Sequence, residues 1–173
     1  MSPSAPIRIA QILGITTSAV YSGTVLYQYL VMLPSYISMS QTNPVKAVEK
    51  WYCMHIMSKG RLAPAALAGV LINAFLTVRY YISTPSSVVL LGSSAVAVWK
   101  MYALTTACFA TFIPWTAKVM LPINFELEHY HQGEGEVGDE RAKALLVDWR
   151  NKSVVRAAPA GAAAVIGAWL ASW

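Results

Sequence analysis

The sequence has few charged residues, and this scarcity excludes most classes of soluble protein. Asp, Glu, Lys and Arg make up 12% of its 173 residues, whereas about 25% is typical of globular chains. Hydrophobic residues make up 56%, and the mean hydropathy is +0.47. This balance excludes a disordered chain, a coiled coil and a collagen. The length is that of one domain, and we expect a single membrane domain over residues 1–173.

Cysteine and histidine are also scarce, with two and three residues in the chain. Two cysteines cannot build the disulfide framework of a small secreted protein. Three histidines disfavour a buried metal cage made by the protein alone. The sequence also lacks a Walker loop, a dinucleotide-binding glycine pattern, a Cys-x-x-Cys pair and a Ser-His-Asp arrangement. We therefore expect no metal and no organic cofactor.

The positive charge of the chain is distributed unlike that of a nucleic-acid-binding protein. The net charge is +5, but nucleic-acid-binding proteins gather Lys and Arg on one soluble face. Here the basic residues fall in the gaps between long apolar stretches. This pattern is typical of a membrane protein, so we expect the lipid bilayer, and no nucleic acid, among its partners.

Four apolar stretches are long enough to cross a bilayer, because a spanning helix needs about 20 mostly apolar residues. The first stretch is too long for the apolar region of a signal peptide, so we expect it to be retained. The sequence predicts an all-α, integral membrane four-helix bundle with a long third connection that is partly helical. The expected spans are residues 9–33, 62–81, 88–113 and 154–173. Shorter helices are expected over Pro44–Met57 in the first connection and Glu140–Trp149 in the third.

The basic residues also predict an orientation, because Lys and Arg near the ends of spans resist translocation. Ten of them lie in or beside the first and third connections, whereas Arg8 and Arg79 lie on the opposite side. We therefore expect both long connections in the cytosol and both termini on the non-cytosolic side. For a fungal chain, the endoplasmic reticulum or another endomembrane is the expected location.

Two polar residues within the expected spans are candidates for contact with a ligand. Lys100 lies inside the third span, where a cation costs about 2.5–3.5 kcal/mol and usually faces a bundle interior. It either holds an anionic or enolic ligand oxygen, or the third helix begins later and Lys100 extends to the interface. Asn73 lies in the second span. It either binds the substrate or makes a hydrogen bond between helices, and the second interpretation is favoured.

A cluster of acidic residues and histidines follows the third span, at Glu126, Glu128, His129 and His131. Two histidines and one carboxylate can form the facial triad of a non-haem metal site. On a helix, however, His129 and His131 point about 200° apart, which favours a solvated helix end. A neutral imidazole is also a suitable general base near neutral pH. His129 or His131 is therefore the candidate base.

Short motifs flank this cluster in a recognisable order. Pro114 ends the third span, Pro122 and Asn124 form a Pro-x-Asn element, and Trp149 precedes Arg156 by seven residues. In this order and within a four-span frame, the chain resembles the DUF1772 family of small four-helix membrane proteins. Fungal members of that family include anthrone oxygenases of aromatic polyketide pathways. One departure is Ser153, where the family often has Asn or His three residues before the Arg.

The resemblance implies a membrane monooxygenase that oxidises an anthrone or a related polycyclic phenol to a quinone with molecular oxygen. On this interpretation Arg156 and a histidine base are catalytic. The residues expected to bind the aromatic substrate are Asn124, Trp149, Trp115, Lys100 and Asn73. One alternative is a non-catalytic membrane scaffold or a carrier of hydrophobic metabolites. A second is a non-haem metal oxygenase that uses the Glu/His cluster. The sequence leaves homo-oligomerisation open.

The spacing of Trp149 and Arg156 makes a geometric prediction. Seven residues correspond to 700° of helical rotation, 20° short of two full turns. If one helix runs through both residues, their side chains lie on the same face. They would then close together over one ligand.

Overall fold

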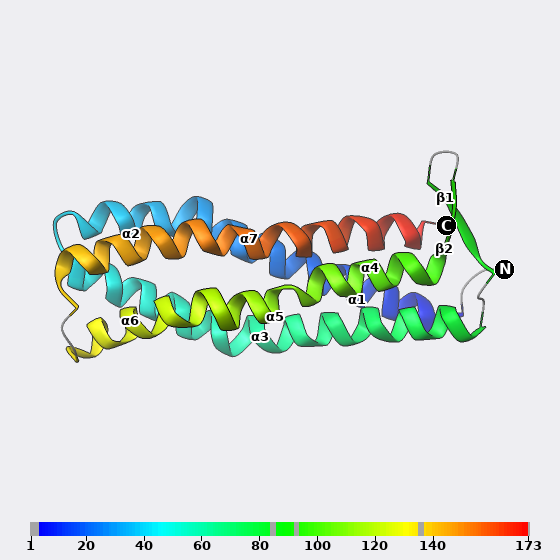
Figure 1. Cartoon of the computed structure of the whole chain (residues 1–173), viewed down its shortest axis with the longest axis horizontal. Helices are drawn as coiled ribbons and strands as arrows, with labels where there is room; N and C mark the ends of the chain where they lie inside the picture. The colour runs from blue at the N-terminus through cyan, green and yellow to red at the C-terminus, as the bar shows by residue number, and fades with distance from the viewer. Residues whose placement is uncertain (1–3, 84–85, 92–93, 135–136, 173) are drawn as a thin grey trace. The chain divides into compact units, whose positions relative to one another are not determined.

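The computed structural model describes residues 4–83, 86–91, 94–134 and 137–172. The structure is 88% helical, which confirms the prediction of an all-α fold (Figure 1). Four helical segments are long and apolar enough to cross a membrane. They are Ala5–Ser40, Pro44–Ser83, Val98–Gln132 and Asp139–Ala171. The chain therefore has the helices of a multi-pass membrane protein.

The first and third segments each contain a π-helical turn. Helix α1 (Ala5–Tyr27) continues through the π-helix η1 (Gln28–Met32) into α2 (Leu33–Ser40). The third segment comprises α4 (Val98–Ala110), α5 (Phe112–Trp115), the π-helix η2 (Thr116–Met120) and α6 (Leu121–Gln132). In both segments a proline occupies the first turn of the helix that follows the π-helix. Such local widenings often occur at functional sites.

Helix α3 (Pro44–Ser83) is a single helix of 40 residues. It begins where Asn43 Oδ1 accepts a hydrogen bond from the backbone N–H of Lys46 at 2.9 Å, and proline suits the first helical position. The predicted amphipathic helix 44–57 and the predicted span 62–81 are therefore parts of one element. At 1.5 Å per residue α3 is about 60 Å long, roughly twice the thickness of a hydrocarbon core.

Helix α7 (Asp139–Ala171) likewise joins the predicted helix 140–149 to the fourth span. Two acidic residues in its first turn complement the positive end of the helix dipole. Before it, α6 ends at Gly133, whose φ of 71° is a left-handed conformation that glycine adopts without strain. The predicted end of the fourth span at Trp173 lies outside the described residues.

The third span begins later than predicted. Within the range 88–97, expected to be helical, the described residues form two antiparallel strands, β1 (Val88–Leu91) and β2 (Ser94–Ala97), with Val88 opposite Ala97. Helix α4 then begins at Val98. The two strands are rich in β-branched residues, which favour extended backbone. The prediction failed because a short apolar run fits a strand and a buried helix equally well.

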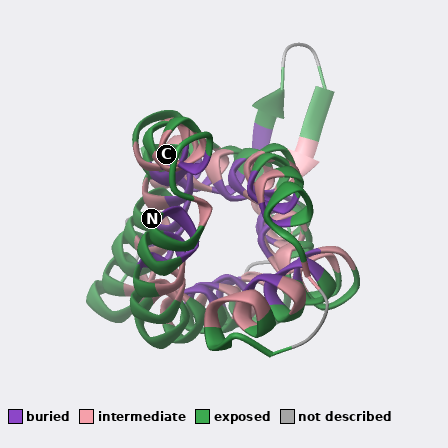
Figure 2. Cartoon of the chain, turned by 90° about the vertical axis from the view of Figure 1, so that its left-hand side faces the viewer, coloured by how far each residue is buried: buried purple, intermediate pink, exposed green. Residues whose placement is uncertain are grey.

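The chain divides into two compact units. Unit 1 comprises Met1–Ser22, Pro64–Thr111 and Ala158–Trp173, and unit 2 comprises Gly23–Ala63 and Phe112–Ala157. Along the longer helices the buried residues lie mainly on one side and exposed residues on the other (Figure 2). Large apolar side chains such as Leu71, Ile82 and Val165 are among the exposed ones. Lipid rather than water is the solvent that suits such surfaces.

Uncharged polar pairs and close helix contacts characterise unit 1. The Gln11 side chain donates to the hydroxyl of Tyr102 at 2.8 Å, and both residues are buried. At Gly69 an added Cβ would overlap the ring of Phe109 and would lie 2.9 Å from Thr17 Oγ1. Small residues allow helix backbones to approach this closely in membranes.

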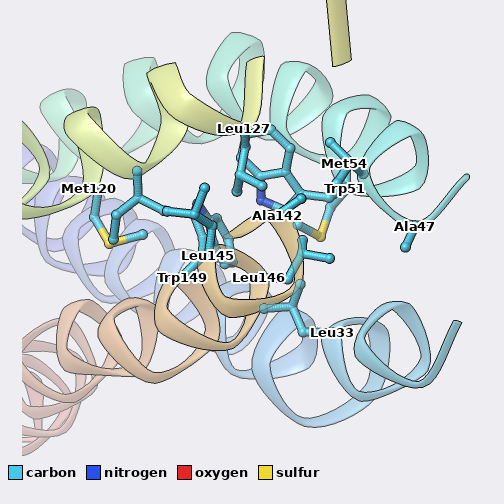
Figure 3. Close-up of a cluster of buried hydrophobic side chains, with 12 residues drawn as sticks. Leu33, Ala47, Trp51, Met54, Met120, Leu127, Ala142, Leu145, Leu146 and Trp149 are labelled. Carbon is cyan, nitrogen blue, oxygen red and sulfur yellow. The ribbon is translucent and has the colours of Figure 1, made fainter. Parts of the chain in front are cut away.

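A hydrophobic core that includes two tryptophans characterises unit 2 (Figure 3). Its buried side chains come from α2, α3, α6 and α7 and from the π-helix η2. They are Leu33, Ala47, Val48, Trp51, Met54, Met120, Ile123, Leu127, Ala142, Leu145, Leu146 and Trp149. Trp51 is fully buried and Trp149 is 3% exposed. One indole comes from α3 and the other from α7, and both lie within this core.

Candidate active site

Asn124 of α6 is one of the few polar side chains buried in unit 2. Its Oδ1 accepts a hydrogen bond from the indole Nε1 of Trp149 at 2.8 Å. Because an indole N–H can only donate, the carbonyl oxygen of the amide must face Trp149. Among the described residues no hydrogen bond from Nδ2 is present. The amino group of Asn124 is therefore available to a ligand oxygen.

Arg156 lies over the same indole. Its guanidinium carbon is 5.5 Å from the centroid of the Trp149 ring, which is within cation–π distance. Helix α7 runs without interruption through both residues. The predicted common face of Trp149 and Arg156 is confirmed.

Trp51 of α3 contacts two aromatic rings, those of Trp149 and His55. Its ring meets Trp149 edge to face, with centroids 6.2 Å apart and an angle of 82° between the planes. It also stacks on His55, with centroids 5.0 Å apart and planes 6° from parallel. Trp51 therefore contacts one aromatic ring on α7 and another on its own helix.

His55 is paired with a carboxylate. Its Nε2 lies 3.3 Å from Glu128 Oε1, and the two side chains are 12% and 20% exposed. His55 follows Trp51 by four residues on α3, and Glu128 follows Asn124 by four residues on α6. This spacing places both members of each pair on one helix face.

Helices α3, α6 and α7 thus bring six polar or aromatic side chains together in one region of unit 2. We call them the aromatic–polar cluster: Trp51, His55, Asn124, Glu128, Trp149 and Arg156. The cluster contains an amide donor, a guanidinium cation and an imidazole–carboxylate pair beside two indole rings. Such a set can bind a planar molecule, stabilise a negative oxygen and accept a proton.

A family model described as Anthrone oxygenase matches residues 51–166, which is more than half of the chain. The chain belongs to the anthrone oxygenase family. The matched segment begins at Trp51 and contains every residue of the aromatic–polar cluster. Comparisons with curated proteins and with solved structures give no match. The family supports an oxygenase role.

The two histidines that the sequence suggested as the base lie elsewhere in this member of the anthrone oxygenase family. His129 is exposed on α6. His131 stacks on Tyr52, with centroids 4.2 Å apart and planes at 27°. The structure therefore does not bring either histidine into the aromatic–polar cluster.

The Glu/His set suggested as a facial triad does not converge. Residues 121–132 are helical, so His129 and His131 diverge as the helical period requires. Glu126 forms two hydrogen bonds with Arg141 at 2.8 and 2.9 Å, and Glu128 pairs with His55. In the part of the chain that the structure describes, no three His, Cys, Asp or Glu side chains group to hold a metal ion. The interpretation of these four residues as a metal site is wrong.

Lys100 lies at the start of the third helical segment, Val98–Gln132, and not midway along a span as predicted. It lies exposed in the first turn of α4, with Nζ 5.6 Å from the centroid of Trp99. The structure agrees instead with the alternative interpretation, in which the third helix begins later and Lys100 lies near its end. Among the described residues it contacts Trp99, and it does not belong to the group of side chains around Trp149.

Asn73 and Trp115 have structural partners. Asn73 is buried in unit 1, where Nδ2 donates to Gly69 O at 2.8 Å and Oδ1 accepts from Thr105 Oγ1 at 3.2 Å. This is the interhelical hydrogen bonding that the sequence favoured. Trp115 lies in unit 2 and donates from Nε1 to Lys152 O at 3.1 Å. It holds the end of α5 against α7.

The sequence reasoning overlooked His55 as a candidate. A histidine four residues after a tryptophan on an amphipathic helix is a detectable signal, because the two rings must share a face. The partner of His55, Glu128, was considered in the sequence analysis, but only as a possible metal ligand. Their proximity required knowledge of how α3 and α6 pack, which no motif encodes.

Proposed function

We propose that the chain is a membrane oxygenase that converts an anthrone, or a related polycyclic phenol of aromatic polyketide origin, to a quinone. Removal of a proton from the central methylene gives an electron-rich anthrolate. The anthrolate reduces oxygen and forms a carbon–oxygen bond, and the resulting peroxide loses water. One oxygen atom enters the quinone and the other leaves as water, so anthrone and oxygen give quinone and water without a metal or an organic cofactor.

The observation that carries this proposal is the convergence of Asn124 and Arg156 on Trp149. Hydrogen bonding to Trp149 orients the amide of Asn124, so Nδ2 is a fixed donor. Arg156 places a cation over the same ring. Donors and cations fixed in advance stabilise charge that develops on an oxygen. A neighbouring cation also favours the ionised form of a phenol or enol.

The surroundings suit a flat and apolar substrate. Trp51 and Trp149 supply indole surfaces against which a fused ring system can pack. A buried core also limits water, which strengthens the electrostatic interactions of the polar groups. We therefore propose Asn124 and Trp149 as substrate-binding residues and Arg156 as the residue that stabilises the oxyanion.

The proposed setting is an endomembrane such as the endoplasmic reticulum, with both termini on the non-cytosolic side. The excess of Lys and Arg in and beside the first and third connections supports this orientation. Most of the aromatic–polar cluster lies in those connections. The proposed site is therefore near the cytosolic face of the membrane.

The test is oxygen uptake by the purified, detergent-solubilised protein with an anthrone, together with the absorbance of the quinone. Heat-denatured protein at the same concentration measures spontaneous oxidation. We expect a rate above this background that persists after chelation, and one labelled atom in the quinone when the gas is ¹⁸O₂. A rate no higher than background contradicts the proposal.

Binding of the anthrone without any accelerated turnover would instead support a carrier of hydrophobic metabolites. Loss of the rate on chelation would require a metal outside the described residues or bound from solution. These outcomes separate the oxygenase from both alternatives that the sequence left open.

A further inference from the structure

The surroundings of His55 differ from those of the other two histidines. Its ring lies between Trp51, on which it stacks, and Glu128, which faces Nε2 at 3.3 Å. Only 12% of its side chain is exposed. His129 is exposed, and His131 stacks on a tyrosine. In the part of the chain that the structure describes, His55 is the histidine held by both a ring and a carboxylate.

The carboxylate determines which ring nitrogen can act. Glu128 faces Nε2, so that nitrogen carries the proton when the imidazole is neutral. The lone pair then lies on Nδ1, which makes no hydrogen bond among the described residues. A carboxylate in this position fixes the tautomer and stabilises the imidazolium that forms after proton transfer. The arrangement is that of a general base and its positioning residue.

A buried donor beside His55 is a second, independent observation. Trp51 is fully buried, and its Nε1 has no hydrogen-bond partner among the described residues. A buried N–H without an acceptor costs about 1–3 kcal/mol, so such groups are rare and need a reason. An oxygen of a bound substrate would be a suitable acceptor, and it would lie beside the ring of His55.

We propose that His55 is the general base of the reaction, Glu128 its positioning residue, and Trp51 Nε1 a donor to a substrate oxygen. This inference rests on the proposed function. Nδ1 takes one methylene proton as the anthrolate forms, and the anthrolate transfers electrons to oxygen and forms the carbon–oxygen bond. The imidazolium then protonates the peroxide. When the second hydrogen leaves the same carbon as a proton, the carbonyl forms, the oxygen–oxygen bond breaks and water departs.

The principal test compares turnover, quinone binding and thermal stability of His55→Gln with those of the wild type. Glutamine keeps a planar group that can lie on Trp51 but cannot act as a base at neutral pH. We expect turnover to fall about 10²–10⁴-fold, the range of general acid–base contributions, with the dissociation constant of the quinone product within about three-fold. Cys53→Ser, two residues away and exposed, is the matched control and should keep the wild-type rate.

Imidazole added to His55→Ala gives a readout that a purely structural role would not produce. A base in solution should restore part of the turnover in proportion to its neutral form. Turnover and a pH profile in His55→Gln that both match the wild type would overturn the inference while leaving the proposed function intact. The absence of wild-type turnover would contradict the proposed function itself.

Glu128→Gln tests the positioning residue and also serves if His55→Gln does not fold. The charged groups that act on His55 are Glu128 from α6, Lys59 from α3 and Arg156 from α7. Without the carboxylate the imidazolium is less favoured, so the acid limb of the pH–rate profile should move to lower pH. We expect turnover to fall about ten-fold, with partial recovery in Glu128→Asp. An unchanged acid limb with an unchanged rate would overturn the assignment of Glu128.

Discussion

Units 1 and 2 differ most in how they contain charge. All eight Asp and Glu residues of the sequence fall in the ranges of unit 2, together with ten of the 13 Lys and Arg residues. Unit 1 has only Arg8, Arg79 and Lys100. Charged groups are costly in hydrocarbon, so unit 1 has the composition of a membrane-embedded part. Unit 2 contains the acidic residues, and most of the basic residues, that acid–base chemistry could use.

The buried asparagines of the two units have different kinds of partner. In unit 1 amides and hydroxyls bind one another, as Asn73 does with Thr105 and Gln11 with Tyr102. In unit 2 the partner of Asn124 is an indole, and a donor remains on the amide. Groups that satisfy each other stabilise a fold, whereas a donor that remains can bind a ligand. The same residue type, asparagine, therefore has a structural role in one unit and a proposed functional role in the other.

The largest expected difference is between Asn124→Ala and its counterpart Asn73→Ala. Loss of an oxyanion donor commonly lowers turnover about 10²–10³-fold, and we expect this for Asn124→Ala. Asn73→Ala should lower the melting temperature but leave turnover per folded molecule within about two-fold. Oxygen uptake and thermal unfolding in the same detergent measure both effects. Equal losses of turnover in the two variants would remove the functional distinction between the asparagines.

The next effect concerns stability alone and compares two glycines of α3. Gly69→Ala places a Cβ against the buried ring of Phe109, whereas at Gly60 nothing lies within 4 Å. Overpacking of this kind costs about 1–3 kcal/mol, so Gly69→Ala should lower the melting temperature. Gly60→Ala should raise it slightly, because alanine favours helix by roughly 0.5–1 kcal/mol. An unchanged melting temperature for Gly69→Ala would contradict the close packing of Gly69 against Phe109.

Much of the fold follows from pattern. Hydrophobic length predicts spanning helices because lipid leaves the backbone no other partners, and the described residues include four helical segments that are long and apolar enough to cross a membrane. Helical rotation alone predicted that Trp149 and Arg156 share a face, and their contact confirms it. Properties of a single helix, such as its length or which residues share a face, could therefore be predicted from the sequence.

The failures have a common physical cause. The strands β1 and β2 were missed because periodicity does not distinguish a strand from a buried helix in a short apolar run. His55 and Glu128 were not paired because they are 73 residues apart and meet only through the packing of α3 on α6. Contacts between distant segments depend on tertiary structure, and helix periodicity in the sequence does not reveal them.

The variant Arg156→Lys tests whether Arg156 anchors a helix at the membrane interface or binds a ligand. Lysine keeps the charge but not the planar fork of donors, so it cannot reproduce bidentate contact with an enolate. We expect a folded protein whose turnover is about ten-fold lower, equivalent to roughly 1.4 kcal/mol of transition-state stabilisation. The initial rate per mole of inserted protein is the measurement. Near-normal turnover would leave Arg156 as an interfacial anchor.

The smallest effect is expected for Lys100→Ala, the basic residue of unit 1 that the sequence had placed within a span. Lys100 is exposed in the first turn of α4 and contacts the ring of Trp99, and exposed cation–π contacts contribute only about 0.5–1 kcal/mol. Turnover should stay within about two-fold of the wild type and the melting temperature should fall by at most a few degrees. The rate should be measured beside that of Arg156→Ala, because both variants lose one positive charge. If Lys100→Ala were as impaired as Arg156→Ala, charge in unit 1 would have a catalytic role, and the functional contrast between the units would be wrong.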